Sequence, residues 1–181
     1  VADVSLQLAG GEVTALMGRN GAGKSSLLWA IQGAVPSSGT VTVDGVDPRT
    51  LPVAEVGRLV TLVPQSAGDL LYLPTVAAEC AQADEESDVP AGTTAATLSR
   101  LGVEVPPDRH PRDLSEGQRL ALVLAIQLAT EPKVLLLDEP TRGLDYAMKA
   151  QLATIVRRLG DDGTCVVIST HDVEFAAAAT E

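Results

Sequence analysis

The sequence predicts an α/β fold with a mainly parallel core sheet, and three observations support this prediction. Residues 134–139 and 164–169 are short apolar runs of the kind that forms strands buried on both faces of a sheet. Residues 25–32 and 146–159 carry apolar side chains at helical spacing and alternate with those runs. Residues 68–130 contain helical patterns and no convincing strand. The alternation indicates a parallel sheet, interrupted here by a helical insertion.

Further strands are expected in the first part of the chain. Residues 4–8 alternate apolar and polar side chains, and a turn at 9–11 leads into the apolar run 12–17, so we expect a hairpin. Residues 40–45 alternate in the same way and end in a turn. These segments predict an N-terminal antiparallel β subdomain. Residues 59–63 predict one more strand, with Gln65 at its carboxyl edge.

The insertion is expected to consist of helices and irregular connections. A helix begins at residues 75–79, a second spans 93–101, and a third spans 120–128. The acidic run 84–90 is interpreted as a solvated connection, since charge runs favour water.

The domain organisation follows from these segments. Residues 1–67 and 131–181 are expected to form the core and residues 68–130 a helical subdomain, within one domain over residues 1–181. The chain begins in a strand and stops inside a helical pattern, so we expect it to be part of a longer polypeptide.

Composition excludes several classes of protein. The net charge is −11, from 13 basic and 24 acidic residues, which argues against a nucleic-acid partner. Cys80 and Cys165 lie far apart and lack the spacing of metal ligands, so we expect both to be reduced. No apolar run approaches the ~18–20 residues that a membrane span needs.

A phosphate-binding pattern, G-x-x-x-x-G-K-S, spans residues 18–25 between a predicted strand and a predicted helix. Its glycines let the backbone approach a ligand, and the helix N-terminus adds partial positive charge. Lys24 supplies a cation for the outer phosphates, and Ser25 supplies an oxygen for Mg²⁺. The pattern therefore predicts a P-loop NTPase fold, although a glycine-rich turn that binds nothing is the alternative. The residues expected to hold the nucleotide are Gly18, Arg19, Asn20, Gly21, Ala22, Gly23, Lys24, Ser25 and Ser26.

Two acidic residues end the most apolar predicted strand. Asp138 stands at the carboxyl end of this strand, where it can hold Mg²⁺ through water or merely cap the strand. Glu139 can accept a proton from an attacking water or orient that water; the alternative is a structural carboxylate.

Five features after the phosphate loop resemble, in order, the motifs of the ATP-binding subunits of ABC transporters. They are the Q-loop glutamine at Gln65, the signature as LSEGQ at residues 114–118, the Walker B segment with its glutamate at residues 134–139, the D-loop at residues 143–145 and the switch histidine at His171. The resemblance covers residues 4–177, and the order of all six motifs makes it specific.

The resemblance implies roles for particular residues. The catalytic residues would be Glu139, His171 and Gln65; the metal ligands would be Ser25, Gln65 and Asp138; further nucleotide contacts would come from Ser115, Gly117, Gln118 and Asp145. In this family two cassettes pair head to tail, and the signature of one completes the ATP site of the other. The residues themselves allow a simpler reading, because Ser115 followed three residues later by Gln118 predicts a capping box at a helix start.

The chain departs from the family pattern at several positions. Glu116 replaces a glycine of the signature, Ala121 and Ile126 stand where arginines are usual, and Tyr146 replaces the proline after the D-loop. Trp29 is expected in the core rather than against adenine, since it lies on the predicted helix after the phosphate loop.

The resemblance implies hydrolysis of ATP, with Mg²⁺, to power transmembrane transport. It implies transmembrane subunits and a second ATP-binding subunit as partners, no nucleic acid, and a peripheral location at the cytoplasmic face of the membrane. Residues 139–146 and 171–176 look most like energy-coupling-factor importers, which take up vitamins or metal ions such as cobalt.

Two alternatives stay open. A soluble ABC ATPase acting on ribosomes or DNA is disfavoured by the acidic composition and by the short insertion. A nucleotide-binding regulatory subunit without turnover is disfavoured by the presence of Glu139 and His171.

Overall fold

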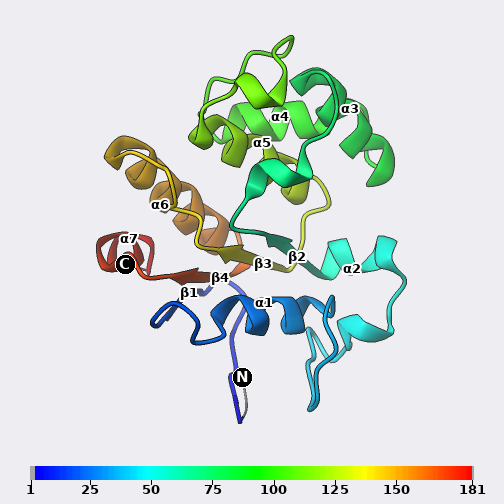
Figure 1. Cartoon of the computed structure of the whole chain (residues 1–181). Coiled ribbons are helices and arrows are strands. Elements are labelled where there is room, and N and C mark those ends of the chain that lie inside the picture. The colour runs from blue at the N-terminus through cyan, green and yellow to red at the C-terminus, as the bar shows by residue number, and fades with distance from the viewer. Residues whose placement is uncertain (1–2, 181) are drawn as a thin grey trace. The chain divides into compact units, whose positions relative to one another are not determined.

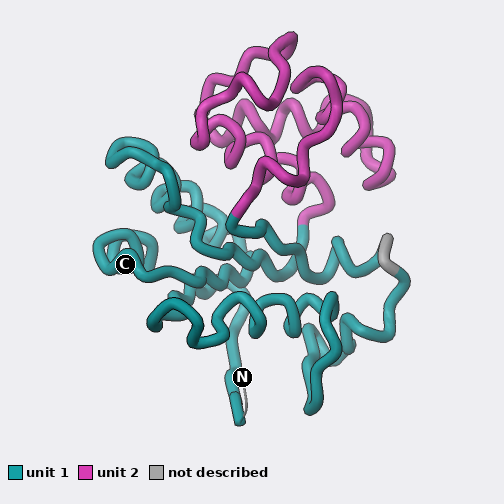
Figure 2. The backbone as a smooth tube through the Cα atoms, viewed as in Figure 1, with its two compact units in different colours: residues 1–65, 132–181 teal, residues 66–131 magenta. Residues whose placement is uncertain are grey.

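The computed structural model describes residues 3–180, apart from the side chains at positions 53 and 54. The chain divides into two compact units (Figure 2). Unit 1 comprises residues 1–65 and 132–181, and unit 2 comprises residues 66–131. Among the described residues, none of the helices has both the length and the apolar character needed to span a bilayer.

The core of unit 1 is a four-stranded parallel sheet, which confirms the predicted α/β class (Figure 1). Its strands are β1 (Val13–Met17), β2 (Val60–Val63), β3 (Val134–Asp138) and β4 (Cys165–Thr170). They pair in the order β1-β4-β3-β2. Since all four run in the same direction, their carboxyl ends lie at one edge, where open α/β sheets bind ligands.

Helices cover both faces of this sheet (Figure 1). On one face, Leu28 of α1 (Lys24–Gln32) packs with side chains of β2, β3 and β4, among them Leu62 and Leu136. Trp29 is partly buried against the same cluster, as predicted for a core residue. The other helices of unit 1 are α6 (Tyr146–Asp161) and α7 (Val173–Thr180) on the opposite face, α2 (Val53–Leu59), and the short 3₁₀ helix η1 (Pro48–Thr50).

The expected antiparallel β subdomain does not form regular strands among the described residues. Residues 3–8 are irregular, with Val4 and Leu6 nearly half exposed, so the predicted hairpin is wrong. Residues 40–45 contribute only one antiparallel bridge, between Val43 and Val46. The predicted turn at its end is confirmed at residues 44–45, both with positive φ. A two-stranded ribbon is marginal in water unless a third strand or a helix covers its apolar face.

The regular elements of unit 2 are all helices, joined by irregular connections. Its elements are η2 (Ala67–Leu70), α3 (Val76–Glu86), α4 (Thr93–Arg100), η3 (Pro111–Asp113) and α5 (Glu116–Leu128). A separate apolar cluster that includes Val76, Leu98 and Leu122 holds them together. Ala121, which stands where the family usually has an arginine, is buried in this cluster. The three predicted helices are confirmed, and α5 begins earlier than its apolar run.

The acidic run at residues 84–90 is not the solvated connection that we expected. Helix α3 continues to Glu86, and Asp84 is only 4% exposed. Its carboxylate accepts hydrogen bonds from the backbone N–H groups of Gly92 (2.6 Å) and Thr94 (2.8 Å) and from the Thr94 hydroxyl (2.6 Å). Burial raises the pKa of Asp84, but these hydrogen bonds outweigh it and hold the pKa below its ordinary value. Asp84 therefore connects α3 to the N-terminus of α4 by hydrogen bonds.

Candidate functional site

The phosphate loop connects β1 to α1. Gly21 and Gly23 have φ of 81° and 93°, a left-handed conformation that side chains disfavour. Gly18 lacks this conformation, and a Cβ atom there would lie at an ordinary 3.6 Å from Cβ of Ala22. The conformational requirement for glycine thus holds at two of the three positions. Helix α1 begins at Lys24, so its first N–H groups face the loop without intrahelical partners.

Lys24 and Glu139 meet above the carboxyl end of the sheet. The Lys24 ammonium donates to the carbonyl oxygen of Gly18 at 2.9 Å and lies 3.4 Å from Oε1 of Glu139. Both side chains are about nine-tenths buried, with 11% exposed in each. Oε1 of Glu139 accepts no hydrogen bond. A mostly buried carboxylate oxygen in this state is poised to take a donor from a bound molecule.

The backbone at Glu139 is strained. Its φ is 48°, which is uncommon for a residue with a side chain, and its N–H donates to the carbonyl of Ser169 at 2.9 Å. Such strain costs roughly 1–3 kcal/mol and gathers at functional sites, where surrounding structure enforces it. Here β3 and β4 enforce it, because the hydrogen bond joins the ends of these two strands.

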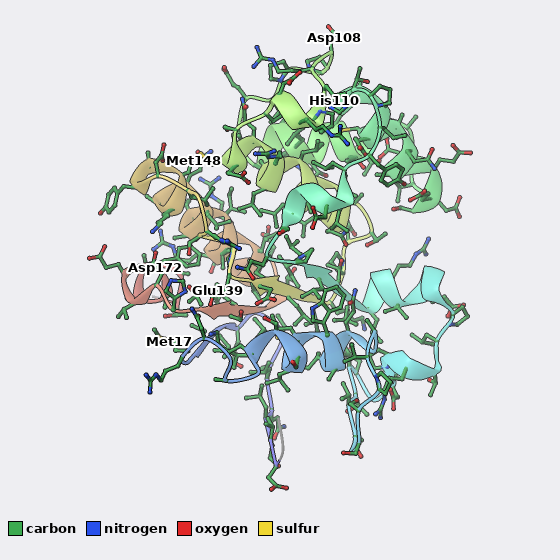
Figure 3. The ribbon with its side chains drawn as sticks, viewed as in Figure 1. Met17, Asp108, His110, Glu139, Met148 and Asp172 are labelled. Atoms are coloured by element: carbon green, nitrogen blue, oxygen red, sulfur yellow. The ribbon has the colours of Figure 1, made fainter. Side chains whose placement is uncertain are left out.

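His171 is a third predicted site residue, in contact with Glu139. It follows β4 directly, and its Nδ1 lies 2.8 Å from Oε2 of Glu139. Glu139 therefore contacts a cation on one oxygen and an imidazole on the other. Figure 3 labels Glu139 in this part of unit 1.

Lys24, Glu139 and His171 line a pocket of about 660 Å³. It lies within unit 1 and is lined by Asn20, Gly21, Gly23, Lys24, Ser25, Ser26, Gln65, Glu139, Arg142 and His171. The predicted nucleotide ligands Gly18, Arg19 and Ala22 belong to the same loop but do not line the pocket. The structure thus brings most of the predicted residues of unit 1 to one cavity.

Arg142 lines the pocket and was not predicted as a site residue. Its N–H donates to the carbonyl of Glu139 at 3.2 Å, which closes a turn after β3. The sequence did contain a signal for it. Arg142 is a basic residue only three positions after Glu139, so a turn after the strand can bring it back to the carboxyl edge of the sheet.

The oxygen groups of the site fit Mg²⁺. No cluster of three His, Cys, Asp or Glu side chains within the described residues would hold a metal ion alone. Ser25 and Gln65 line the pocket. They carry a hydroxyl and an amide oxygen, which are hard ligands of the kind that Mg²⁺ prefers beside phosphate oxygens and water. Asp138 is 4% exposed and accepts a hydrogen bond from the Ser169 hydroxyl at 2.5 Å. It would therefore hold the ion through water rather than directly.

The signature residues lie in unit 2, at the start of α5. Ser115 Oγ accepts from the N–H of Gln118 (3.2 Å), and Gln118 Oε1 accepts from the N–H of Ser115 (3.1 Å), which confirms the capping box. Gln118 also donates to the carbonyl of Glu104 at 2.8 Å. Glu116, the unusual carboxylate, pairs with Arg119 at 2.5 Å, and Gly117 is buried. The positive charge of Arg119 therefore offsets the carboxylate that Glu116 adds to the signature.

Asp145 caps helix α6. Its Oδ1 accepts from the N–H of Met148 at 2.8 Å, and the residue is exposed. Tyr146 is 81% exposed, so an aromatic side chain is held in water beside the predicted D-loop residue.

Comparisons with known proteins agree with these motifs. The protein-family model described as "ABC transporter" matches residues 1–142. A putative ABC transporter ATP-binding protein of Streptomyces coelicolor is 57% identical over 176 residues, which covers 96% of this chain and 31% of the relative. The cobalt import ATP-binding protein CbiO of Rhodobacter capsulatus is 38% identical, covering 99% of this chain and 66% of the relative. The chain spans 31% of the length of this Streptomyces coelicolor relative and 31% of that of a putative ABC transporter ATP-binding protein of Streptomyces avermitilis.

Solved structures show the same fold. A dimeric ATP-binding cassette in a post-hydrolysis state bound to ADP and Pi superposes with a TM-score of 0.81 at 26% identity, covering 97% of this chain and 82% of that one. The structure of cbiO1 from Clostridium perfringens, part of the transporter complex cbiONQ, gives 0.82 at 29% identity, covering 95% and 72%. These similarities confirm the predicted P-loop NTPase fold. The chain therefore belongs to the ABC transporter family, as an ATP-binding domain.

Proposed function

We propose that this chain binds and hydrolyses ATP and that the hydrolysis powers transmembrane transport. One observation carries the proposal: Glu139 contacts both Lys24 and His171, and all three line one pocket together with the phosphate loop. A cation for phosphates, a carboxylate with a hydrogen-bond-free oxygen and an imidazole are the groups that phosphoryl transfer to water requires.

Each group has a distinct role in this proposal. The phosphate loop and Lys24 hold the phosphates, and Lys24 leaves Glu139 for the outer phosphates when ATP binds. Glu139 then orients the attacking water and accepts its proton. His171 contacts Oε2 of Glu139 and would orient that carboxylate and bind the terminal phosphate. Gln65, which follows β2 and lines the pocket, would help to hold the water and the metal. Bound Mg²⁺ would neutralise charge on the transferred phosphoryl group.

The chain acts in a pair. We propose that Ser115, Gly117, Gln118 and Asp145 serve the ATP held by a second cassette, which is a copy of this chain or a related one. A similar cassette is dimeric with ADP and Pi bound. The N-terminus of α5 has the polarity that suits a phosphate. The core of residues 1–67 and 131–181 would then bind ATP, and the helical subdomain of residues 68–130 would present the signature.

We propose import of a metal ion or vitamin as the transported cargo class. The support is the 38% identity to a protein named for cobalt import and the structural likeness to a subunit of the complex cbiONQ. Transmembrane subunits would be the partners, and the chain would lie at the cytoplasmic face of the membrane, peripherally.

Substitution of the catalytic carboxylate tests the enzymatic part. Glu139→Gln in the full-length protein should abolish ATP turnover while sparing ATP binding, because the amide keeps the shape but cannot accept the proton. Glu174→Gln is the matched control, since Glu174 is exposed in the first turn of α7. Turnover of Glu139→Gln at the unsubstituted rate would contradict the proposal.

Co-purification tests the transport part. The full-length protein, isolated from its native membrane in mild detergent, should carry integral membrane subunits that mass spectrometry identifies. Stable association with ribosomes and no membrane subunit would favour the soluble class of ABC ATPase instead.

A further inference from the structure

The ring of His171 is not held by packing. Its side chain is 66% exposed, and the hydrogen bond to Glu139 is the contact that orients it. An exposed imidazole keeps one position only when the backbone that carries it is fixed. The residues on either side of His171 therefore decide how it meets Glu139.

Hydrogen bonds to both carboxylate oxygens and from the backbone N–H fix the residue after His171. Asp172 Oδ2 accepts from the Lys149 ammonium at 2.7 Å, and its Oδ1 accepts from the N–H of Phe175 at 3.0 Å, which caps α7. The N–H of Asp172 donates to the hydroxyl of Thr170 at 3.0 Å, and Thr170 is fully buried. His171 thus lies between a buried strand residue and a carboxylate that is itself tied to helix α6. Figure 3 labels Asp172 and Glu139 in unit 1.

The ion pair has the character of a structural link rather than a loose surface contact. Asp172 has 17% of its side chain exposed and Lys149 has 35%. The hydrogen bond from Lys149, followed by that from Phe175, lowers the pKa of Asp172 from its ordinary value. Asp172 is consequently charged at neutral pH, and it accepts hydrogen bonds on both oxygens.

Lys149 also connects this link to the predicted D-loop. It lies in the first turns of α6, and its own N–H donates to the carbonyl of Asp145 at 3.0 Å. Asp145, Lys149 and Asp172 form a continuous hydrogen-bonded path to the loop of His171.

We propose that Lys149 is a positioning residue for His171, acting through Asp172. The proposal rests on the ATPase function proposed above. Lys149 does not line the pocket, so its loss should affect the catalytic step and leave the binding of ATP nearly unchanged. A shift of the D-loop end of α6 would reach His171 along the same path.

Steady-state ATP hydrolysis by the full-length protein tests the proposal. Lys149→Met should lower kcat about fivefold to tenfold and change KM for ATP less than about twofold, as expected for a coupled contact beside the reacting groups. Lys149→Arg should recover most of kcat, because it retains the cation. Asp172→Asn keeps an acceptor for the cap of α7 but weakens the ion pair, and the double variant should be no slower than the slower single variant.

A matched control separates this role from general stability. Lys133→Met removes another ion pair of unit 1, the one with Asp44. The side chains of Lys133 and Asp44 are 57% and 66% exposed, and neither lines the pocket. It should leave kcat unchanged. An unchanged kcat in Lys149→Met, additive losses in the double variant, or an equal loss in Lys133→Met would each overturn the positioning role.

The reference variant Glu139→Gln keeps the two proposals distinguishable. If hydrolysis survives Glu139→Gln, the proposed function is wrong and the positioning role falls with it. If hydrolysis depends on Glu139 and Lys149→Met leaves kcat intact, only the positioning role is wrong.

Discussion

The ammonium of Lys24 lies 3.4 Å from Oε1 of Glu139, so a cation of the phosphate loop rests against a carboxylate at the end of β3. Two mostly buried groups of opposite charge stabilise each other here. A bound triphosphate would offer Lys24 a stronger partner and release Oε1 of Glu139 for water. Under the proposed function, the contact would link nucleotide binding to the release of the Glu139 carboxylate.

Replacing Lys24 should weaken ATP binding. Lys24→Ala removes a charge-assisted hydrogen bond to phosphate, worth roughly 1.5–3 kcal/mol, or about tenfold to a hundredfold in Kd. Titration of the full-length protein with a fluorescent ATP analogue measures this effect. Lys133→Ala removes a lysine from an exposed ion pair and should bind the analogue normally. Equal affinities of Lys24→Ala and the unsubstituted protein would refute the role of the loop.

Two damaged chains should repair one ATP site when mixed. Lys24→Ala damages the phosphate loop, and Ser115→Arg places a bulky side chain at the exposed N-cap of α5. Under two-fold head-to-tail pairing, a heterodimer combines both defects in one site and leaves the other site intact. The mixture should retain about one labelled ATP per heterodimer, and each variant alone should retain almost none.

The retention assay depends on verified heterodimers, which two different affinity tags provide. Retention is measured instead of turnover, because one intact site need not complete the full cycle. Verified heterodimers that retain no ATP would refute the shared site. If the native pair consists of two different cassettes, the substitutions are made in that pair.

Asp84 should stabilise unit 2. In Asp84→Asn the amide group cannot accept all three hydrogen bonds from Gly92 and Thr94, so at pH 7 we expect a loss of about 1–3 kcal/mol in the free energy of unfolding. Urea denaturation monitored by circular dichroism measures it. Glu85→Gln, an exposed neighbour on α3, is the control and should change stability little.

The effect of Asp84 should depend on pH. Its pKa is lower in the folded protein than the ordinary 3.8, so its stabilisation is complete above that value. The stabilisation is lost as pH falls through the folded pKa. The difference between the unsubstituted protein and Asp84→Asn should therefore shrink below about pH 4. A difference that stays constant down to pH 2 would show that the charge of Asp84 is irrelevant.

Gly160 should be required for the packing of α6. An added Cβ would lie 2.9 Å from Cγ2 of Val13 and 3.3 Å from the carbonyl oxygen of Gly11. Gly160→Ala should lower the free energy of unfolding by about 1–3 kcal/mol through overpacking. Gly57→Ala, in α2, meets nothing within 4 Å and should be neutral or gain up to about 1 kcal/mol from helix propensity. Equal thermal stability of the two variants would contradict this view of the packing.

The sequence by itself determined the parallel sheet and the residues at its carboxyl edge. Buried strands of a parallel sheet are nearly all apolar, so β3 and β4 were visible without a structure, and Asp138 and His171 marked where they end. The helix after the phosphate loop and the capping box at Ser115 were equally predictable from the sequence, because both depend on neighbours within a few residues.

Only the tertiary structure decided which side chains touch. Glu139 contacts both Lys24 and His171 because β3 lies beside β4 and the phosphate loop turns back over the same edge, and no local pattern encodes these distances. The alternating residues 4–8 resembled a strand, yet a strand needs a partner and a surface to cover, which local alternation cannot supply. The sequence predicted that Asp84 is solvated, whereas in the structure the N-terminus of α4 supplies hydrogen-bond donors to its carboxylate. Hydrophobic periodicity is local, whereas pairing, burial and ion contacts depend on segments far apart in the chain.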